Sequence, residues 1–362
     1  MKVLHIINNL EIGGAELLLI QSIQELLDTT PSIQHHVMAL YSGGPLEKDF
    51  YALSGCSILG FKKNVVGLYK IFQLRKFIVK NKFDIVHTHL FDSMIVARLA
   101  VPKSVRLFST YHSALYDKSN MFYSKKYLFI DRLTFKKRHI LLFVSNTVKE
   151  NIVKALRIGY KRKYVLENFC DKRFYKIYQF RNTEALKLIA VGNLKIEKNY
   201  ELAVEALGLI NNPAILLDIY GEGYNREKLQ QLIVKYNLQN NIFLKGNKKI
   251  TSEIHFQYDA FLMTSYAEGM PVALLEALTS GLPAILNNIP ELHESAETAA
   301  IYFDRNSSAG LVKVLEKVIK EKNILKHLSE EAIWISKKYS ITNHVQRLKE
   351  LYHNYSNVLK KI

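Results

Sequence analysis

The sequence is poor in cysteine and has no long hydrophobic run. Its 362 residues include two cysteines, Cys56 and Cys170, which are too few for a disulfide framework or a cysteine metal cluster and fit a reducing compartment. No apolar run approaches the roughly 20 residues that a membrane-spanning helix needs. The opening residues, MKVLHIINNL, are too few and too polar for a signal peptide. We therefore expect a cytoplasmic protein.

Two nucleotide-binding motifs are also missing. No G-x-x-x-x-G-K-[ST] segment occurs, so nothing in the sequence suggests a P-loop NTPase. The segment GEGYNR at residues 221–226 lacks the third glycine of a dinucleotide-binding fingerprint, which weakens an oxidoreductase interpretation.

Acidic residues are scarce relative to basic ones. The sequence has 50 Lys and Arg against 33 Asp and Glu, a formal net charge of +17. Nucleic acid, an anionic membrane surface and a phosphate-bearing substrate would all be attracted to such a protein. Charge alone does not choose among them.

What is present is a repeated alternation of short β-branched runs with helical patterns, typical of parallel sheets covered by helices. A chain of this length exceeds one hydrophobic core, and the pattern predicts two doubly wound α/β domains. We expect an N-terminal domain over 1–180 with a polar linker near 176–185, a C-terminal domain over 181–342, and a terminal helix over 343–362. The expected strands are 2–8, 35–41, 57–61, 84–89, 105–110, 140–145, 163–167, 186–192, 215–221, 242–246, 260–265, 283–288 and 299–303.

The stretch SYAEGMPVALLEALTSGLPAIL, residues 265–286, places two carboxylates eight positions apart. Gly269 allows a tight turn, and Pro271 suits the start of a helix, whose free N–H groups form an anion site at the end of a strand. Glu268 would lie at the mouth of this site. Glu276 would project from the helix, where a ribose diol could donate hydrogen bonds to it. The alternative is that Glu276 snorkels to solvent or pairs with a lysine.

Residues 268–276, EGMPVALLE, resemble the E-x7-E signature of the large retaining glycosyltransferase family 4, which has the GT-B fold. GGAE at 13–16 resembles the family's glycine-rich loop, VGNLKIEKN at 191–199 its G-R-L-x-x-x-K-N segment, and YGEG at 220–223 its G-x-G turn. The resemblance covers almost the entire chain. It implies two Rossmann-like domains facing across a cleft, the first binding the acceptor and the second the nucleotide-sugar, with the C-terminal helix crossing back to the first.

The resemblance also implies roles for individual residues. Glu268 would contact the transferred sugar, Glu276 the ribose, and Lys198 the donor diphosphate. The family's arginine falls on Asn193, which supplies no charge, so Lys195 and helix N-termini would assist Lys198. The remaining donor-site and acceptor-site positions are Gly269, Met270, Gly13, Gly14 and His112, the last of which would lie near the sugar. For His112 and the two N-terminal glycines, the alternatives are an ordinary surface loop and a simple turn.

Residues 119–139, SNMFYSKKYLFIDRLTFKKRH, interleave basic and aromatic side chains. A helix here would suit the anionic face of a membrane. The alternative is an ordinary packing helix with a solvated basic face. Nucleic acid is not expected, because no recognised binding module accompanies the charge.

These features together predict a retaining glycosyltransferase. Since no D-x-D triplet occurs, we expect no divalent metal and no other cofactor. The donor is expected to be a nucleotide-sugar, with UDP-sugars foremost. The acceptor is expected to be a lipid-linked or growing cell-surface glycan of capsule, exopolysaccharide or lipopolysaccharide synthesis, reached at the inner face of the plasma membrane. The alternatives are a GT-B nucleotide-sugar 2-epimerase and a non-catalytic nucleic-acid-binding or scaffold protein.

Overall fold

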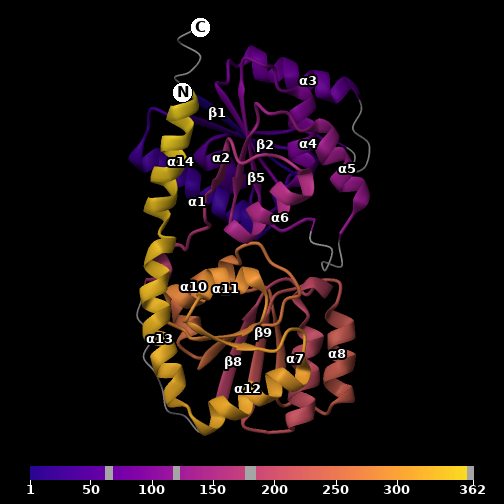
Figure 1. Ribbon diagram of the computed structural model, residues 1–362, viewed down its shortest axis with the longest axis vertical. Coiled ribbons are helices and arrows are strands. Elements are labelled where there is room, and N and C mark those ends of the chain that lie inside the picture. Colours follow the sequence, from indigo (N-terminus) through magenta and orange to yellow (C-terminus); the bar gives the residue numbers. More distant parts are fainter. Residues whose placement is uncertain (62–67, 117–122, 176–184, 357–362) are drawn as a thin grey trace. The chain divides into compact units, whose positions relative to one another are not determined.

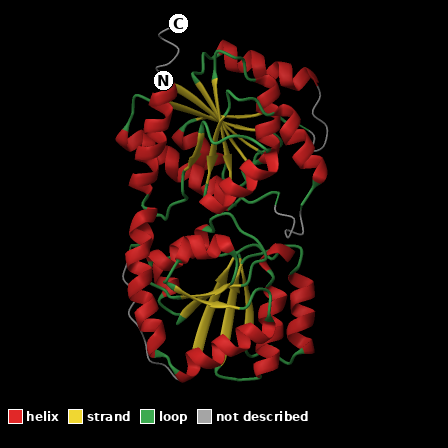
Figure 2. Ribbon diagram, in the orientation of Figure 1, coloured by secondary structure: helices red, strands yellow, loops and turns green. Residues whose placement is uncertain are grey.

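The computed structural model describes residues 1–61, 68–116, 123–175 and 185–356. The chain forms two compact units (Figures 1 and 2). Unit 1 comprises Met1–Asn168 and Ile341–Ile362, and unit 2 comprises Phe169–Ser340. The linker expected near 176–185 falls outside the described residues except for its last position.

The units divide earlier than the predicted boundary at 180. The backbone N–H of Cys170 donates to the Tyr339 carbonyl at 2.9 Å, and Phe174, the last residue of the short 3₁₀ helix η1 (Lys172–Phe174), is buried. These contacts attach the segment after Asn168 to unit 2, although its sequence does not mark a break there.

Unit 1 contains a seven-stranded parallel sheet in the order β3-β2-β1-β4-β5-β6-β7. The order reverses between β1 and β4, which is the switch point of a doubly wound fold, where ligands generally bind beside the carboxyl ends of the strands. The strands are β1 (Lys2–Ile7), β2 (Gln34–Ala39), β3 (Gly55–Ile58), β4 (Ile85–His89), β5 (Arg106–Tyr111), β6 (Ile140–Phe143) and β7 (Lys163–Val165).

The helices of unit 1 cover both faces of this sheet (Figure 2). They are α1 (Gly14–Thr29), α2 (Glu47–Leu53), α3 (Leu68–Lys80), α4 (Phe91–Ala100), α5 (Lys125–Thr134), α6 (Asn146–Leu156) and α14 (Ile341–Ser356). The terminal helix α14 packs beside α1 (Figure 1), and its Val345, Leu348 and Tyr352 are buried. Their spacing of three and four residues places the three side chains on one stripe of the helix, as expected for a helix that packs against a core.

Unit 2 contains a six-stranded parallel sheet in the order β10-β9-β8-β11-β12-β13, with its own switch point between β8 and β11. The strands are β8 (Leu186–Val191), β9 (Ile215–Tyr220), β10 (Ile242–Gly246), β11 (Ala260–Met263), β12 (Ala284–Asn287) and β13 (Ala300–Phe303). The helical elements are η2 (Ile196–Lys198), α7 (Tyr200–Ile210), α8 (Arg226–Lys235), α9 (Ser252–His255), α10 (Val272–Thr279), α11 (Pro290–Ala296), α12 (Ser308–Lys320), α13 (Asn323–Ser336) and η3 (Lys337–Tyr339).

A buried charge network fixes helix α5 to the core of unit 1. The Arg98 guanidinium donates to an Asp131 carboxylate oxygen at 2.5 Å, and both side chains are fully buried. The hydroxyls of Tyr111 and Tyr116 donate to Asp131 at 2.8 and 2.7 Å. Since a buried carboxylate is stable only when its lone pairs are satisfied, this network sets which face of α5 points inward.

Candidate active site

Two loops of unit 2 meet at the carboxyl ends of β8 and β11. The loop after β8 continues into η2, and the loop after β11 leads to α10. The Thr264 hydroxyl donates to the Lys198 carbonyl at 2.9 Å, and the Tyr266 N–H donates to the Glu197 carbonyl at 2.9 Å. These two bonds hold the loops together and bring their side chains within reach of each other.

The result is an ion pair between two of the predicted site residues. Lys198 Nζ lies 2.6 Å from Glu268 Oε1, and their side chains are 25% and 10% exposed. A charge-assisted hydrogen bond of this length is strong when partly shielded from water. The sequence predicts a ligand role for each residue, but it gives no sign that they pair with one another.

Glu276 lies on α10, whose Leu274, Leu275 and Leu278 are buried. Glu276 as a whole residue is half-buried, and burial of its carboxyl group raises the pKa to about 8, with a further contribution from the nearby charge of Asp171. Arg173 opposes this shift, but it is itself bound to Asp171 at 2.7 Å. No ion pair to Glu276 is found among the described residues, in contrast to the alternative of lysine pairing.

Close contacts with neighbouring backbone atoms explain why both positions of the YGEG turn are glycine. A Cβ atom on Gly221 would lie 2.1 Å from the Gly192 carbonyl oxygen, and one on Gly223 would lie 2.4 Å from the Leu194 carbonyl oxygen. The turn after β9 therefore packs directly on the backbone of the loop after β8. Asn193 and Lys195, on that same loop, are exposed, whereas Gly269 and Met270 are buried in the turn before α10.

The remaining predicted residues lie in unit 1. Gly13 and Gly14 stand at the start of α1, where Gly13 has an extended backbone with φ of −144°, so its conformation does not require glycine. His112 follows β5. Burial lowers the pKa of His112 to about 4, and its Nε2 atom is buried with no hydrogen-bond partner among the described residues.

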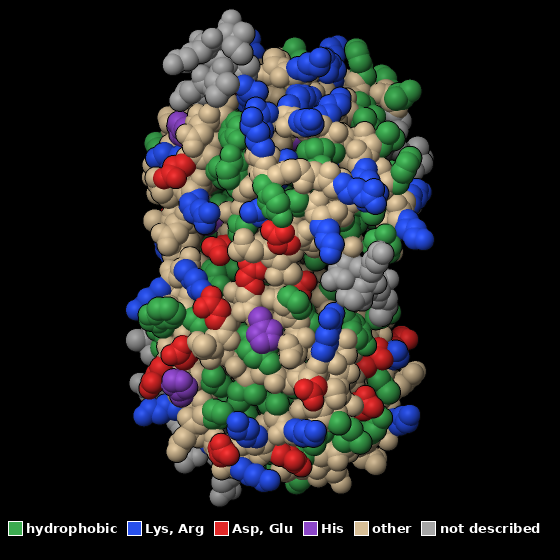
Figure 3. Space-filling view, in the orientation of Figure 1, with side chains coloured by type: hydrophobic (Ala, Val, Ile, Leu, Met, Phe, Trp, Pro, Cys, Tyr) green, Lys and Arg blue, Asp and Glu red, His purple; other side chains and the backbone are tan. Residues whose placement is uncertain are grey.

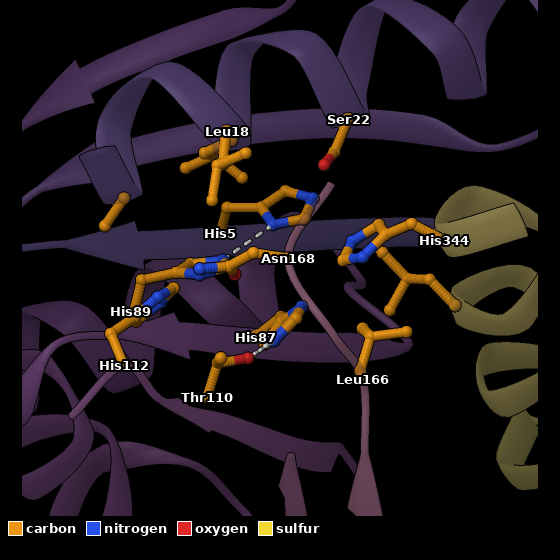
Figure 4. Close-up of a pocket in the computed structure, with 13 residues that line it drawn as sticks. His5, Leu18, Ser22, His87, His89, Thr110, His112, Leu166, Asn168 and His344 are labelled. Carbon is orange, nitrogen blue, oxygen red and sulfur yellow. Dashed lines mark hydrogen bonds between the residues drawn. The ribbon is translucent and has the colours of Figure 1, made fainter. Parts of the chain in front are cut away.

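A cavity of about 30 Å³ opens beside His112 within unit 1. Figure 4 shows imidazole rings from several elements directed into it. Its lining includes His5, His87, His89, His112, His344 and Asn168. Of these residues, only His112 is among the site residues predicted from the sequence. The available signal was the H-x-H spacing at the end of β4, which puts two imidazoles on one face of a strand.

Two models of known families match this chain. One, described as Glycosyltransferase Family 4, matches residues 12–174. The other, described as Glycosyl transferases group 1, matches residues 171–333. Together the two models match residues 12–333, and the chain belongs to the family of glycosyltransferases that they describe. The expectation drawn from the EGMPVALLE and GGAE motifs is thereby confirmed.

Two curated relatives illustrate the range of similarity. The UDP-N-acetylglucosamine--peptide N-acetylglucosaminyltransferase GtfA subunit of Streptococcus agalactiae is 35% identical over 114 residues, which are 31% of this chain and only 22% of that protein. The UDP-Gal:alpha-D-GlcNAc-diphosphoundecaprenol alpha-1,3-galactosyltransferase of Escherichia coli is 27% identical over 331 residues, 84% of this chain and 83% of that protein.

A solved structure shares the fold along the whole chain. Anabaena Alr3699/HepE in complex with UDP has a TM-score of 0.82 at 16% identity, with 98% of this chain and 100% of that chain covered. This likeness confirms the predicted fold class, an α/β GT-B protein with two Rossmann-like parallel-sheet domains. Within the described residues, no helix is both long and apolar enough to cross a membrane.

Proposed function

We propose that the protein is a retaining glycosyltransferase that moves a sugar from a UDP-sugar to a lipid-linked or growing cell-surface glycan. The observation that carries this proposal is the Lys198–Glu268 pair at the switch point of unit 2, with Glu276 on the helix that follows. A cation, an acceptor for sugar hydroxyls and an acceptor for ribose hydroxyls are the groups that a nucleotide-sugar requires.

In this proposal, the donor diphosphate takes the place of Glu268 beside Lys198. As the glycosidic bond breaks, negative charge grows on the leaving diphosphate, and the Lys198 ammonium stabilises it. Glu268, released from the lysine, accepts hydrogen bonds from the transferred sugar. Positive charge develops on the sugar ring, and a phosphate oxygen takes the proton of the acceptor hydroxyl. The chain's own residues supply charge and orientation, and no protein nucleophile is required.

Charge distribution supports an anionic acceptor bound by unit 1. Unit 1 has 29 Lys and Arg against 13 Asp and Glu, whereas unit 2 has 21 against 20. The excess of basic over acidic residues, which is 16 in unit 1 and 1 in unit 2, is thus almost entirely in unit 1. Basic side chains also predominate over acidic ones on the visible face of this unit (Figure 3). A polyprenyl diphosphate or an anionic leaflet carries the complementary charge.

Helix α5 offers a surface of the kind that binds a membrane. Phe129 and Leu133 are 66% and 72% exposed, and the exposed Lys125, Lys126 and Arg132 lie on the same helix. Apolar and cationic side chains together favour an anionic bilayer surface. The first residues of the predicted segment, 119–122, lie outside the described residues.

The proposal is tested by incubating the protein with a panel of nucleotide-sugars and a lipid-linked glycan acceptor, with mass detection of products. We expect UDP release together with an acceptor enlarged by one sugar. Conversion of the donor to its 2-epimer would instead indicate an epimerase. Binding of an oligonucleotide but not of UDP in calorimetric titrations would contradict the proposal.

A further inference from the structure

We propose that His5, His87 and His89 form a zinc-binding site in unit 1, separate from the donor-binding residues of unit 2. The strand register places the three residues together. His5 on β1 is paired directly with His87 on the neighbouring β4, and His89 lies two residues farther along β4. Since side chains alternate across a sheet with a period of two, all three imidazoles are on one face.

The distances between ring atoms suit a metal. His5 Nδ1 lies 3.4 Å from His89 Nε2, in a hydrogen-bond contact within the cluster. Two nitrogens each about 2.0–2.1 Å from a tetrahedral zinc ion stand about 3.3–3.4 Å apart. One nitrogen from each of the three residues lies within 4.8 Å of the others, so modest side-chain rotation brings all three onto one ion. Figure 4 shows the three rings around a common space.

Neighbouring groups orient these rings as they do at known metal sites. His5 Nε2 lies 3.1 Å from His35 Nδ1, which can accept its N–H and leave the His5 Nδ1 lone pair facing His89. His87 lies between two hydroxyls, with Thr110 Oγ1 2.7 Å from Nε2 and Tyr352 Oη 2.6 Å from Nδ1. Whichever His87 nitrogen binds the ion, the hydroxyl beside that nitrogen must move away, and the hydroxyl beside the other nitrogen can accept its N–H. Partners of this kind fix the tautomer and raise ligand affinity.

The donor set and the space around it favour zinc over the hard cations. Imidazole nitrogens suit Zn²⁺ and its transition-metal neighbours, whereas Mg²⁺ and Ca²⁺ prefer oxygen. His5, His87 and His89 are 1%, 2% and 7% exposed, so the site is shielded from bulk water. The adjoining cavity of about 30 Å³ has room for a water molecule as fourth ligand.

The test uses the full chain without any oligohistidine tag, freed of metal by dialysis against a chelator. Titration with Zn²⁺ by calorimetry, and with Co²⁺ by visible absorption, should give one equivalent per chain with the absorption of a tetrahedral site. Bound Zn²⁺ should raise the midpoint of thermal unfolding, and chelator should reverse that rise. Absence of saturable binding by the wild-type protein would overturn the proposal.

Variants separate this site from adventitious binding. His5→Gln and His89→Gln should each weaken Zn²⁺ binding at least about tenfold, because each removes one of the three ligand nitrogens. The matched control is His327→Gln, which alters an exposed histidine of unit 2. This variant should bind Zn²⁺ with the wild-type affinity. An equal affinity of the His89→Gln variant and the wild-type protein for Zn²⁺ would also overturn the proposal. If both cluster variants fail to fold, the wild-type titrations still decide it.

Discussion

Lys198 Nζ and Glu268 Oε1 lie 2.6 Å apart in unit 2, although the residues are 70 positions apart in the chain. In the proposed function, the donor diphosphate takes the place of Glu268 beside Lys198. We therefore expect donor binding to separate these two side chains.

Replacement of Lys198 should reduce the rate of sugar transfer strongly while the protein remains folded. Lys198→Ala removes the cation proposed to stabilise the leaving diphosphate, and we expect turnover to fall on the order of 10²-fold or more. Glu268→Gln should also lower turnover, because an amide is a weaker acceptor for sugar hydroxyls. The measurement is UDP release with saturating donor and acceptor. Lys326→Ala, at an exposed position of unit 2, should keep the wild-type rate, and wild-type rates in both site variants would defeat the assignment.

Binding of UDP should depend on pH through Glu276. Its pKa of about 8 in the free protein means that the carboxyl is mostly protonated at pH 7, whereas ribose hydroxyls donate to the ionised form. Affinity should therefore rise about tenfold per pH unit below pH 8 and level off above it. Calorimetry in buffers of different ionisation enthalpy should detect proton release. In the Glu276→Gln variant, the affinity for UDP should vary with pH only through the titration of UDP itself. A pH profile equal to that of the wild type would refute the role of Glu276 in binding the ribose.

The same pKa shift affects stability. Between the ordinary value of 4.5 and about 8, the native state holds a proton that the unfolded state has lost. The free energy of unfolding should therefore decrease as pH rises through this range. Glu276→Gln should remove this contribution and stabilise the protein above pH 8, which urea unfolding at several pH values can measure.

An arginine at position 193 should strengthen donor binding. Asn193 is exposed on the loop that carries Lys198, so a longer side chain fits without displacing the core. An added positive charge near the diphosphate should increase the affinity for UDP about tenfold, equivalent to about 1.4 kcal/mol. This increase in affinity should be smaller in high salt. Asn193→Gln is the size control. If the arginine and glutamine variants bind UDP equally, the loop does not approach the diphosphate.

The thirteen strands expected from alternating β-branched runs are all present, and their ends differ from prediction by a few residues. This success has a physical basis, because buried parallel strands need continuous apolar runs that the sequence displays directly. The turn before α10 also follows from local sequence, because Gly269 and Pro271 mark it.

What the sequence does not display is which loops become neighbours. The Lys198–Glu268 pair exists because β8 and β11 are adjacent in the sheet, and the histidine cluster exists because β1 and β4 are adjacent. Both adjacencies are crossovers between strands distant in the chain. The expectations of no divalent metal, of no other cofactor and of a cytoplasmic location stay predictions, and the zinc site proposed for unit 1 departs from the first of them.

Loss of the Asp131 carboxylate should destabilise unit 1 strongly. Asp131→Ala leaves the Arg98 guanidinium buried without its counter-charge, which typically costs about 3–5 kcal/mol. The free energy of unfolding from urea titration measures this loss. Asp28→Ala, at an exposed position of α1, should change it by less than about 0.5 kcal/mol. A small effect at Asp131 would mean that Arg98 finds another partner.

Membrane binding should depend on the exposed apolar side chains of α5. Phe129→Glu and Leu133→Glu should each reduce flotation with anionic liposomes at low salt, because they place a negative charge where the bilayer is expected. Trp334→Glu, which changes a side chain of α13 that is 65% exposed, is the matched control. No flotation of the wild-type protein would indicate a soluble acceptor.

Helix α14 completes unit 1, although every residue of unit 2 precedes it in the chain. During synthesis on the ribosome, residues 169–340 therefore emerge in full before the first unit has its last helix. Domains usually finish folding from the N-terminus onwards, and this architecture reverses that order. Until α14 arrives, the hydroxyl that Tyr352 places against His87 is missing and the apolar face of α1 that α14 covers stays open to water. The nascent first unit therefore cannot close until residues 341–356 have been synthesised.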